Sequence, residues 1–147
     1  MKLLIIHGPN LNLLGKREPG IYGSLTLAQI NDMIHSKAAE MGLEADTMQS
    51  NSEAEIIGMI HNGDFDLLII NPAAYTHTSI AIRDAIAAVG KPAIEVHISN
   101  IHGREEFRRR SFIAEVAIGQ ITGFGAESYL LAILAAKKLL SKEQSHS

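Results

Sequence analysis

Apolar residues along this chain follow two alternating patterns: short continuous runs, and longer segments in which they recur every three or four positions. The continuous runs predict buried strands over 3–7, 65–70, 93–98 and 118–122, and a weak alternation of apolar and polar residues predicts another strand over 43–49. The periodic segments predict helices over 27–41, 53–62, 80–89, 105–114 and 126–140. Residues 141–147 are polar and are expected to form a frayed tail.

The order of these elements predicts the fold class. Strands that alternate with helices at this spacing indicate a parallel sheet covered on both faces. With no linker, repeat or low-complexity segment, the chain suits a single domain over 1–147. We therefore expect an α/β fold with a flavodoxin-like, doubly wound sheet of five parallel strands in three α/β/α layers. Thr26 with Gln29, and Ser52 with Glu55, have the spacing of capping boxes at the first two helices.

The composition is that of an ordinary globular protein and excludes several classes of function. Hydrophobic residues make up 46% of the chain, and cysteine is absent, which excludes disulfides and thiolate metal sites. The formal net charge is -3, so no general attraction to nucleic acid is expected. The N-terminal apolar run is too short for a signal peptide, and no apolar segment reaches the roughly 18 residues that cross a bilayer. We therefore expect a cytoplasmic protein without nucleic-acid or membrane partners.

The segment 8–23, GPNLNLLGKREPGIYG, connects the first strand to the first helix. It is far longer than the roughly 2–6 residues of an ordinary connection. Long loops in compact domains are commonly lids or binding loops. Leu11, Leu14 and Ile21 give this loop apolar anchors that a solvated linker would lack. We predict an active-site lid; the alternative is a structural cover with polar decoration.

Three polar segments, 8–22, 71–78 and 97–102, directly follow the first, third and fourth predicted strands. In a doubly wound parallel sheet, ligands bind beyond the carboxyl ends of the strands. We expect these three segments to converge on one site.

Glu95 and His97 lie two residues apart at the end of a predicted strand, so their side chains point to the same face. A carboxylate beside an imidazole fixes its tautomer and favours its charged form, which suits a general acid at neutral pH. The alternative is a structural histidine at a strand end.

Tyr22 is either a packing residue or a base. An ordinary phenol has a pKa near ~10, and lowering it to neutrality requires about three units, or roughly 4 kcal/mol. One nearby cation lowers a pKa by about 1–3 units, so two would suffice. Arg17 lies in the same loop, and Arg108 follows the fourth strand. The cluster around Arg108, with Arg104, Arg109 and Arg110, is either a solvated face or contributes one arginine to anion binding.

Neutral hydrogen-bond donors also follow the strands. Asn10, Asn71, Ser99 and the backbone after His97 suit a carbonyl oxygen that becomes an enolate, or a substrate carboxylate. Asn71 before Pro72 is equally suited to forming a turn. The segment around His77 is suited both to capping the third helix and to binding.

Asp84 lies about 200° around the third helix from Ile82, off the core stripe and on the side of Ile80. A carboxylate and an apolar side chain on one outward face indicate a subunit contact. Asp84 is then placed to reach a neighbour's site.

The sequence favours catalysis without a cofactor. None of the seven histidines occurs in a zinc-helix pattern, and Gly8 and Gly15 have neither the dinucleotide nor the Walker spacing. We expect no metal site.

Four motifs together resemble one known family, the type II 3-dehydroquinate dehydratases of the shikimate pathway. They are GPNLNLLGKREPGIYG in the first loop, QSNSEAEII before the second helix, NPAAYTHTSIAIRDA after the third strand and IEVHISNIHGREEFRRRS at the fourth. The resemblance covers nearly the whole chain. It implies a flavodoxin-like fold and anti elimination of water from 3-dehydroquinate through an enolate, without metal or Schiff base.

The resemblance also implies a role for each site residue. Tyr22 resembles the base that removes the proton beside the ketone, and Arg17 the lid arginine that keeps it ionised. His97 matches the acid that protonates the departing hydroxyl, with Glu95 as its orienting partner. Asn10 matches the residue that holds a water against the enolate oxygen. The remaining substrate contacts fall on Asn71, His77, Ile98, Ser99 and Arg108, with the substrate carboxylate at Ile98 and Ser99.

The family forms dodecamers, as tetramers of trimers, and Asp84 matches a contact donated by an adjacent subunit. One position departs from the pattern: the family usually has Asn-Pro-Gly-Ala-Tyr where this chain has Ala73. If that position has a positive φ, or if substrate approaches its backbone, the Cβ of Ala73 costs about 1 kcal/mol or more. We expect altered affinity rather than lost chemistry.

Two other hypotheses remain at this point. One is a flavodoxin-like module that binds a small anionic metabolite without turning it over; a passive binder has no reason to keep a tyrosine with two arginines. The other is a phosphoacceptor receiver domain. It is weak because the paired acidic cluster expected after the first strand is replaced by His7-Gly8-Pro9.

Overall fold

The computed structural model describes residues 1–16 and 18–145, except for the side chains of residues 19, 22 and 143–145. Five parallel strands form one sheet in the order β2-β1-β3-β4-β5. The strands are β1 (Lys2–His7), β2 (Glu44–Gln49), β3 (Leu67–Asn71), β4 (Ala93–His97) and β5 (Gly119–Thr122). This is the predicted doubly wound α/β fold, and the five predicted strands are confirmed.

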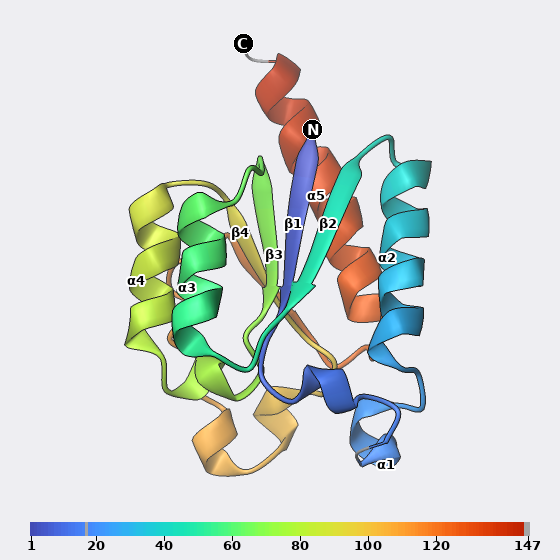
Figure 1. Ribbon diagram of the computed structural model, residues 1–147, viewed down its shortest axis with the longest axis vertical. Coiled ribbons are helices and arrows are strands. Elements are labelled where there is room, and N and C mark those ends of the chain that lie inside the picture. Colours follow the sequence, from blue (N-terminus) through green and yellow to red (C-terminus); the bar gives the residue numbers. More distant parts are fainter. Residues whose placement is uncertain (17, 146–147) are drawn as a thin grey trace.

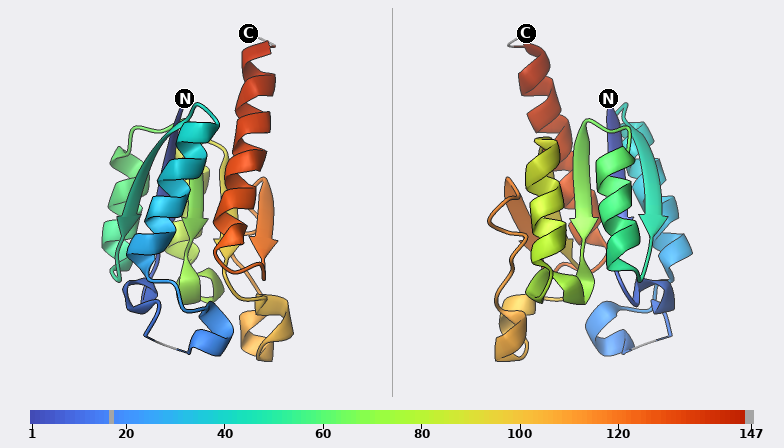
Figure 2. Two further views of the ribbon diagram at one scale, coloured as in Figure 1. Left: turned by 90° about the vertical axis from the view of Figure 1, so that its right-hand side faces the viewer. Right: turned by 60° about the vertical axis from the view of Figure 1, so that its left-hand side comes forward.

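Helices cover both faces of the sheet (Figures 1 and 2). On one face lie α2 (Leu27–Glu40) and α5 (Glu127–Ser145), and on the other lie α3 (Glu53–Asn62) and α4 (Ile80–Val89). Because neighbouring side chains of a strand point to opposite faces, Leu3 and Ile5 pack against the first pair of helices, while Leu4 and Ile6 pack against the second. Both faces of β1 are therefore apolar, which explains its continuous hydrophobic run.

The two predicted helix starts are present. Thr26 and Gln29 form a complete capping box: the Thr26 hydroxyl accepts from the Gln29 backbone N–H, and the Gln29 side chain accepts from the Thr26 N–H. At α3, the Ser52 hydroxyl accepts from the Glu55 N–H at 3.2 Å. Each helix therefore begins where the sequence predicts.

The predicted helix over 105–114 is wrong. The segment contains only a short 3-10 turn, η4 (Glu106–Arg108), after another, η3 (Ile101–Gly103). The Phe112 N–H donates to the Thr76 carbonyl, and the Ser111 hydroxyl accepts from the N–H groups of Ile113 and Ala114. These bonds to a distant loop and a nearby side chain replace the i to i−4 bonds of a helix.

The ends of two other segments differ from expectation. Helix α5 was expected to stop at Leu140 but continues to Ser145, a stretch without the glycine or proline that would end it. The lid loop contains two short turns of helix, η1 (Leu11–Leu13) and α1 (Pro19–Tyr22), that the pattern did not predict. In the described part of the chain, no helix is long and apolar enough to span a bilayer.

Candidate active site

The carboxyl ends of β1, β3 and β4 lie at the same edge of the sheet, beside a cavity of about 210 Å³. Residues from all three predicted segments line this cavity, as expected. The predicted site residues among them are Asn10, Asn71, His77, His97, Ile98, Ser99 and Arg108. The predicted convergence of the three segments on one cavity is therefore present, and the functional role of these residues stays a prediction.

His97 and Glu95 form a hydrogen-bonded pair at the end of β4. His97 Nε2 lies 2.5 Å from Glu95 Oε2, and Glu95 is fully buried. The carboxylate also accepts hydrogen bonds from the hydroxyls of Thr76 and Ser111. Burial acts to raise the pKa of Glu95, but His97 and the two hydroxyl donors outweigh it, and the net pKa is lowered. Glu95 is therefore ionised at neutral pH.

The bond to Glu95 also determines which nitrogen of His97 can act on a ligand. Because Nε2 faces the carboxylate, it carries a proton, and Nδ1 is the ring nitrogen left for a ligand. His97 is only 4% exposed, so its ring cannot turn freely. The bond to Glu95 and the burial of the ring therefore fix the tautomer and the orientation of His97.

His77 lies on η2 (Ala73–His77), and its Nδ1 donates to the Arg110 carbonyl at 2.7 Å. Burial lowers the pKa of His77, more than the Arg110 carbonyl raises it. A neutral ring that donates through Nδ1 has Nε2 as an acceptor. His77 can therefore accept a hydrogen bond from a ligand hydroxyl in the cavity.

Two arginines supply positive charge to the cavity. Arg108 was predicted, and Arg104, from the same basic cluster, also lines it. Arg104 Nη1 donates to Ser99 Oγ at 3.4 Å, and Arg108 Nε lies 2.8 Å from the carboxylate of the exposed Glu105. The cavity therefore suits an anionic ligand, and Arg104 is a lining residue that was not among the predicted site residues.

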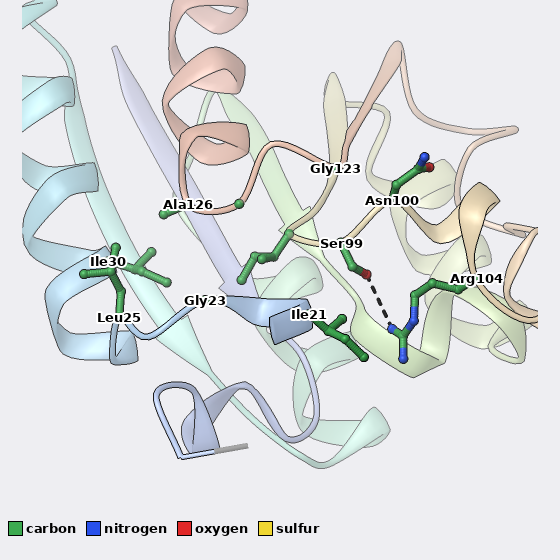
Figure 3. A pocket seen from close by; sticks show the side chains of 11 residues that line it. Ile21, Gly23, Leu25, Ile30, Ser99, Asn100, Arg104, Gly123 and Ala126 are labelled. Atoms are coloured by element: carbon green, nitrogen blue, oxygen red, sulfur yellow. Dashed lines mark hydrogen bonds between the residues drawn. The ribbon is translucent and has the colours of Figure 1, made fainter. Parts of the chain in front are cut away.

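A second cavity, of about 330 Å³, lies between the lid and the loop after β5 (Figure 3). Ile21 and Gly23 line it from the lid, and it shares Ile98, Ser99 and Arg104 with the first cavity. Among the described side chains, the remaining lining is mostly apolar and contains no acid or base. Of the described titratable side chains, His77 and His97 line the first cavity, and the second cavity adjoins it next to the lid residues Ile21 and Gly23.

Asn71 belongs to a buried hydrogen-bonded chain that the sequence did not predict. Its amide contacts the Tyr129 hydroxyl, which contacts His7, which in turn contacts Asn31. Burial lowers the pKa of His7 to about 4 and raises that of Tyr129. The only sequence signal was a histidine at the end of an otherwise apolar strand.

Two cavity residues have left-handed backbones. Asn10 has φ 69 and Ala73 has φ 52. Asparagine tolerates this region, whereas alanine is strained there. The family usually has glycine at this position, in Asn-Pro-Gly-Ala-Tyr. Ala73 therefore has the positive φ at which alanine is expected to cost free energy relative to glycine.

Four predicted site residues do not appear in the described lining of the cavity: Glu95, which reaches it through its bond to His97, and Arg17, Tyr22 and Asp84. Arg17 lies outside the described residues, and Tyr22 ends α1 with its side chain outside that description. Asp84 lies on the outer face of α4, where its side chain is 65% exposed and pairs with Arg83 at 3.1 Å. Its outward direction is as predicted. Among the described residues, no group of three or more acidic or histidine side chains could hold a metal ion.

The model of the family described as Dehydroquinase class II matches residues 1–137 of this chain. The chain belongs to the class II dehydroquinase family. The 3-dehydroquinate dehydratase of Geotalea daltonii is 61% identical over 137 residues, covering 92% of this chain and 95% of that protein. The one from Desulforudis audaxviator is 56% identical over 144 residues, covering 97% and 96%.

Solved structures of class II dehydroquinases share the fold. The type II dehydroquinase of Butyrivibrio crossotus superimposes with a TM-score of 0.88 at 47% identity, covering 90% of this chain and 94% of that one. The resemblance drawn from the four motifs is confirmed, and so is the fold class.

Proposed function

We propose that this chain is a hydro-lyase that eliminates water in the anti sense from 3-dehydroquinate, giving 3-dehydroshikimate in the shikimate pathway of aromatic amino acid biosynthesis. Family membership supports the substrate. The observation that carries the chemistry is the buried Glu95–His97 pair at the edge of a cationic cavity. Such a pair suits a general acid far better than a passive binding site.

Proton removal is assigned to Tyr22. Its phenolate takes the proton from the carbon beside the ketone, and the C–H electrons form an enolate. Arg17 and Arg108 keep the phenol ionised, since two cations together supply the shift of about three units in its pKa. Asn10 holds a water against the enolate oxygen and stabilises its negative charge.

Loss of the hydroxyl is assigned to His97. As the enolate collapses, the C–O bond breaks, a C=C bond forms, and His97 donates its Nδ1 proton so that the hydroxyl leaves as water. Glu95 against Nε2 stabilises the cationic ring before transfer and fixes its direction. Tyr22 ends with one proton and His97 with one fewer, so exchange with solvent restores both groups. No metal or cofactor takes part in this sequence.

The remaining contacts bind and orient the substrate. The backbone and hydroxyl at Ile98 and Ser99 meet the substrate carboxylate, while Asn71, His77 and Arg108 contact the rest of the substrate. All five line the cavity beside His97. A substrate held on several sides in this way reacts without the entropy cost of finding its partner groups.

The test is to mix purified protein with 3-dehydroquinate and follow the appearance of enone absorbance. His97→Ala and Tyr22→Phe should each lower kcat by about 10²–10⁴-fold with circular dichroism unchanged. His61→Ala, an exposed histidine on α3, is the matched control and should retain the wild-type rate. A flat wild-type trace beside an active control enzyme would favour a non-catalytic binder, and a near-normal rate in Tyr22→Phe would refute its assignment as base.

We further propose that the chain assembles as a homododecamer, a tetramer of trimers, in which Asp84 reaches a neighbouring active site. Ile80, 55% exposed, lies with Asp84 on the outer face of α4, which supports a subunit contact there. Sedimentation should give about twelve times the 15.9 kDa of one chain. Asp84→Asn should raise KM without changing the mass; a monomeric, fully active wild type would overturn this proposal.

A further inference from the structure

A continuous chain of hydrogen bonds links the interior of the protein to the cavity. Asn31 on α2 contacts His7 on β1 at 2.8 Å, His7 contacts Tyr129 on α5 at 2.9 Å, and Tyr129 contacts Asn71 on β3 at 3.0 Å. His7 and Tyr129 are fully buried, and Asn71 is 2% exposed. Four elements therefore meet through side chains that have little access to water.

This hydrogen-bonded network ends at the backbone N–H of Ala73, which fixes the direction of the hydrogen bonds at Asn71. The Ala73 N–H donates to Asn71 Oδ1 at 3.0 Å, and a backbone N–H can only donate. Oδ1 therefore faces Ala73, and Nδ2 must be the atom that donates to the Tyr129 oxygen. If the amide of Asn71 rotated by half a turn, its NH2 group would face the Ala73 N–H, and two donors would then oppose each other.

The directions of the remaining hydrogen bonds in this network follow in the same way. The Tyr129 oxygen accepts from Asn71, and burial keeps its phenol protonated, so its hydrogen points to His7 Nδ1. Burial also keeps His7 neutral, so Nδ1 accepts while Nε2–H donates to Asn31 Oδ1. Every donor meets an acceptor in one direction only, and reversing one bond would disrupt the next.

We propose that Tyr129, supported by His7, is a positioning residue for the elimination: it locks the Asn71 amide so that one N–H of known direction faces the cavity. Asn71 has two amide hydrogens, one of which is used by Tyr129. The other is available to an acceptor oxygen of the ligand, such as a hydroxyl of the substrate. A flipped amide would place its carbonyl oxygen there instead, and that oxygen cannot donate to the acceptor oxygen of the substrate.

This inference rests on the proposed function, because it takes Asn71 to be a substrate contact. The test is Tyr129→Phe, which keeps the ring packed edge-to-face on His7 and removes only the hydroxyl. We expect KM to rise about tenfold, the factor that corresponds to one net hydrogen bond, with kcat nearly unchanged. Tyr75→Phe is the matched control. The Tyr75 hydroxyl donates to the Asn51 carbonyl and takes no part in the hydrogen-bonded network of Asn71, so KM should stay at the wild-type value.

A double-mutant cycle distinguishes positioning from general damage. If Tyr129 acts through Asn71, Tyr129→Phe should have no further effect on KM in an Asn71→Ala background. Full additivity, or an unchanged KM in the single variant, would overturn the inference while leaving an active wild type and hence the proposed function intact. An inactive wild type would overturn both.

A second variant covers the case in which Tyr129→Phe does not fold. Asn31→Ala, at the half-buried end of the chain, frees His7 to adopt its other tautomer and should raise KM in the same direction by a smaller factor. A folded Asn31→Ala protein with wild-type KM would count against the inference.

Discussion

Replacing Ala73 by glycine should stabilise the protein, because Ala73 has a backbone conformation that favours glycine. Its φ of 52 places it in the left-handed region, directly after Pro72 and at the start of η2. The conformation is held by surrounding bonds: its N–H donates to Asn71 Oδ1, and the Tyr75 N–H donates to the Pro72 carbonyl. The turn that positions Asn71 therefore imposes the strain on alanine.

The expected gain is the difference between two effects. A non-glycine residue in the left-handed region loses roughly 1–2 kcal/mol. Glycine at the same position makes the unfolded chain more flexible, which costs about 0.4–1 kcal/mol. The free energy of unfolding should therefore rise by about 0.5–1 kcal/mol, which for a domain of this size raises Tm by about 2 °C.

The assay is thermal unfolding of both proteins at one concentration and pH, because assembly makes Tm depend on concentration. Ala74→Gly is the matched control: Ala74 lies next along η2 without a positive φ, so glycine there should lower stability by about 0.5–1 kcal/mol. Opposite signs for the two substitutions are expected. If Ala73→Gly destabilises as much as Ala74→Gly, the strain argument is refuted.

The same substitution tests affinity. Ala73 lines the cavity, so a change at this position can alter how the proposed substrate is held. We expect Ala73→Gly to change KM while turnover persists, since no chemical group is removed. An unchanged KM would show that the departure at this position has no consequence for binding.

Three further outcomes are expected. Gly8→Ala should unfold the protein or lower its free energy of unfolding by several kcal/mol, because the new Cβ would lie 2.5 Å from the Pro72 carbonyl oxygen. Gly58→Ala, where α3 leaves open space for a Cβ, should instead raise the free energy of unfolding by about 0.5–1 kcal/mol. Equal melting temperatures for the two variants would contradict this. Burial lowers the pKa of His7 to about 4 in the folded protein, from about 6.5 in the unfolded chain. The unfolded state therefore binds this proton first, and the free energy of unfolding should fall by about 3 kcal/mol as the pH drops from 6.5 to 4. Urea titrations should show a smaller fall in the free energy of unfolding for His7→Asn over the same pH range. Glu95→Gln removes the carboxylate that accepts from His97 Nε2 and holds the ring in one tautomer and orientation, so kcat should drop by about 10–100-fold with KM nearly unchanged. Steady-state kinetics that show wild-type kcat would exclude its orienting role.

The sequence determined the fold and which segments line the candidate site, because both depend on local patterns. Continuous apolar runs identify strands buried on both faces, and β1 and β3 are such strands. Strand alternation placed Glu95 and His97 on one face, and parallel topology brought three strand ends to one edge. None of these inferences requires knowing which distant side chains touch.

Only the tertiary structure decided the contacts between residues far apart in the chain. His7 and Tyr129 are separated by 122 positions, and no periodicity reports that their side chains meet. The segment 105–114 has helical spacing, yet its bonds to Thr76 and Glu95 hold it in turns. The left-handed backbone at Ala73 follows from its hydrogen bond to Asn71 in the folded turn, against the preference of alanine itself. Local preferences amount to about 1 kcal/mol per residue, so a few tertiary hydrogen bonds and buried contacts are enough to override them.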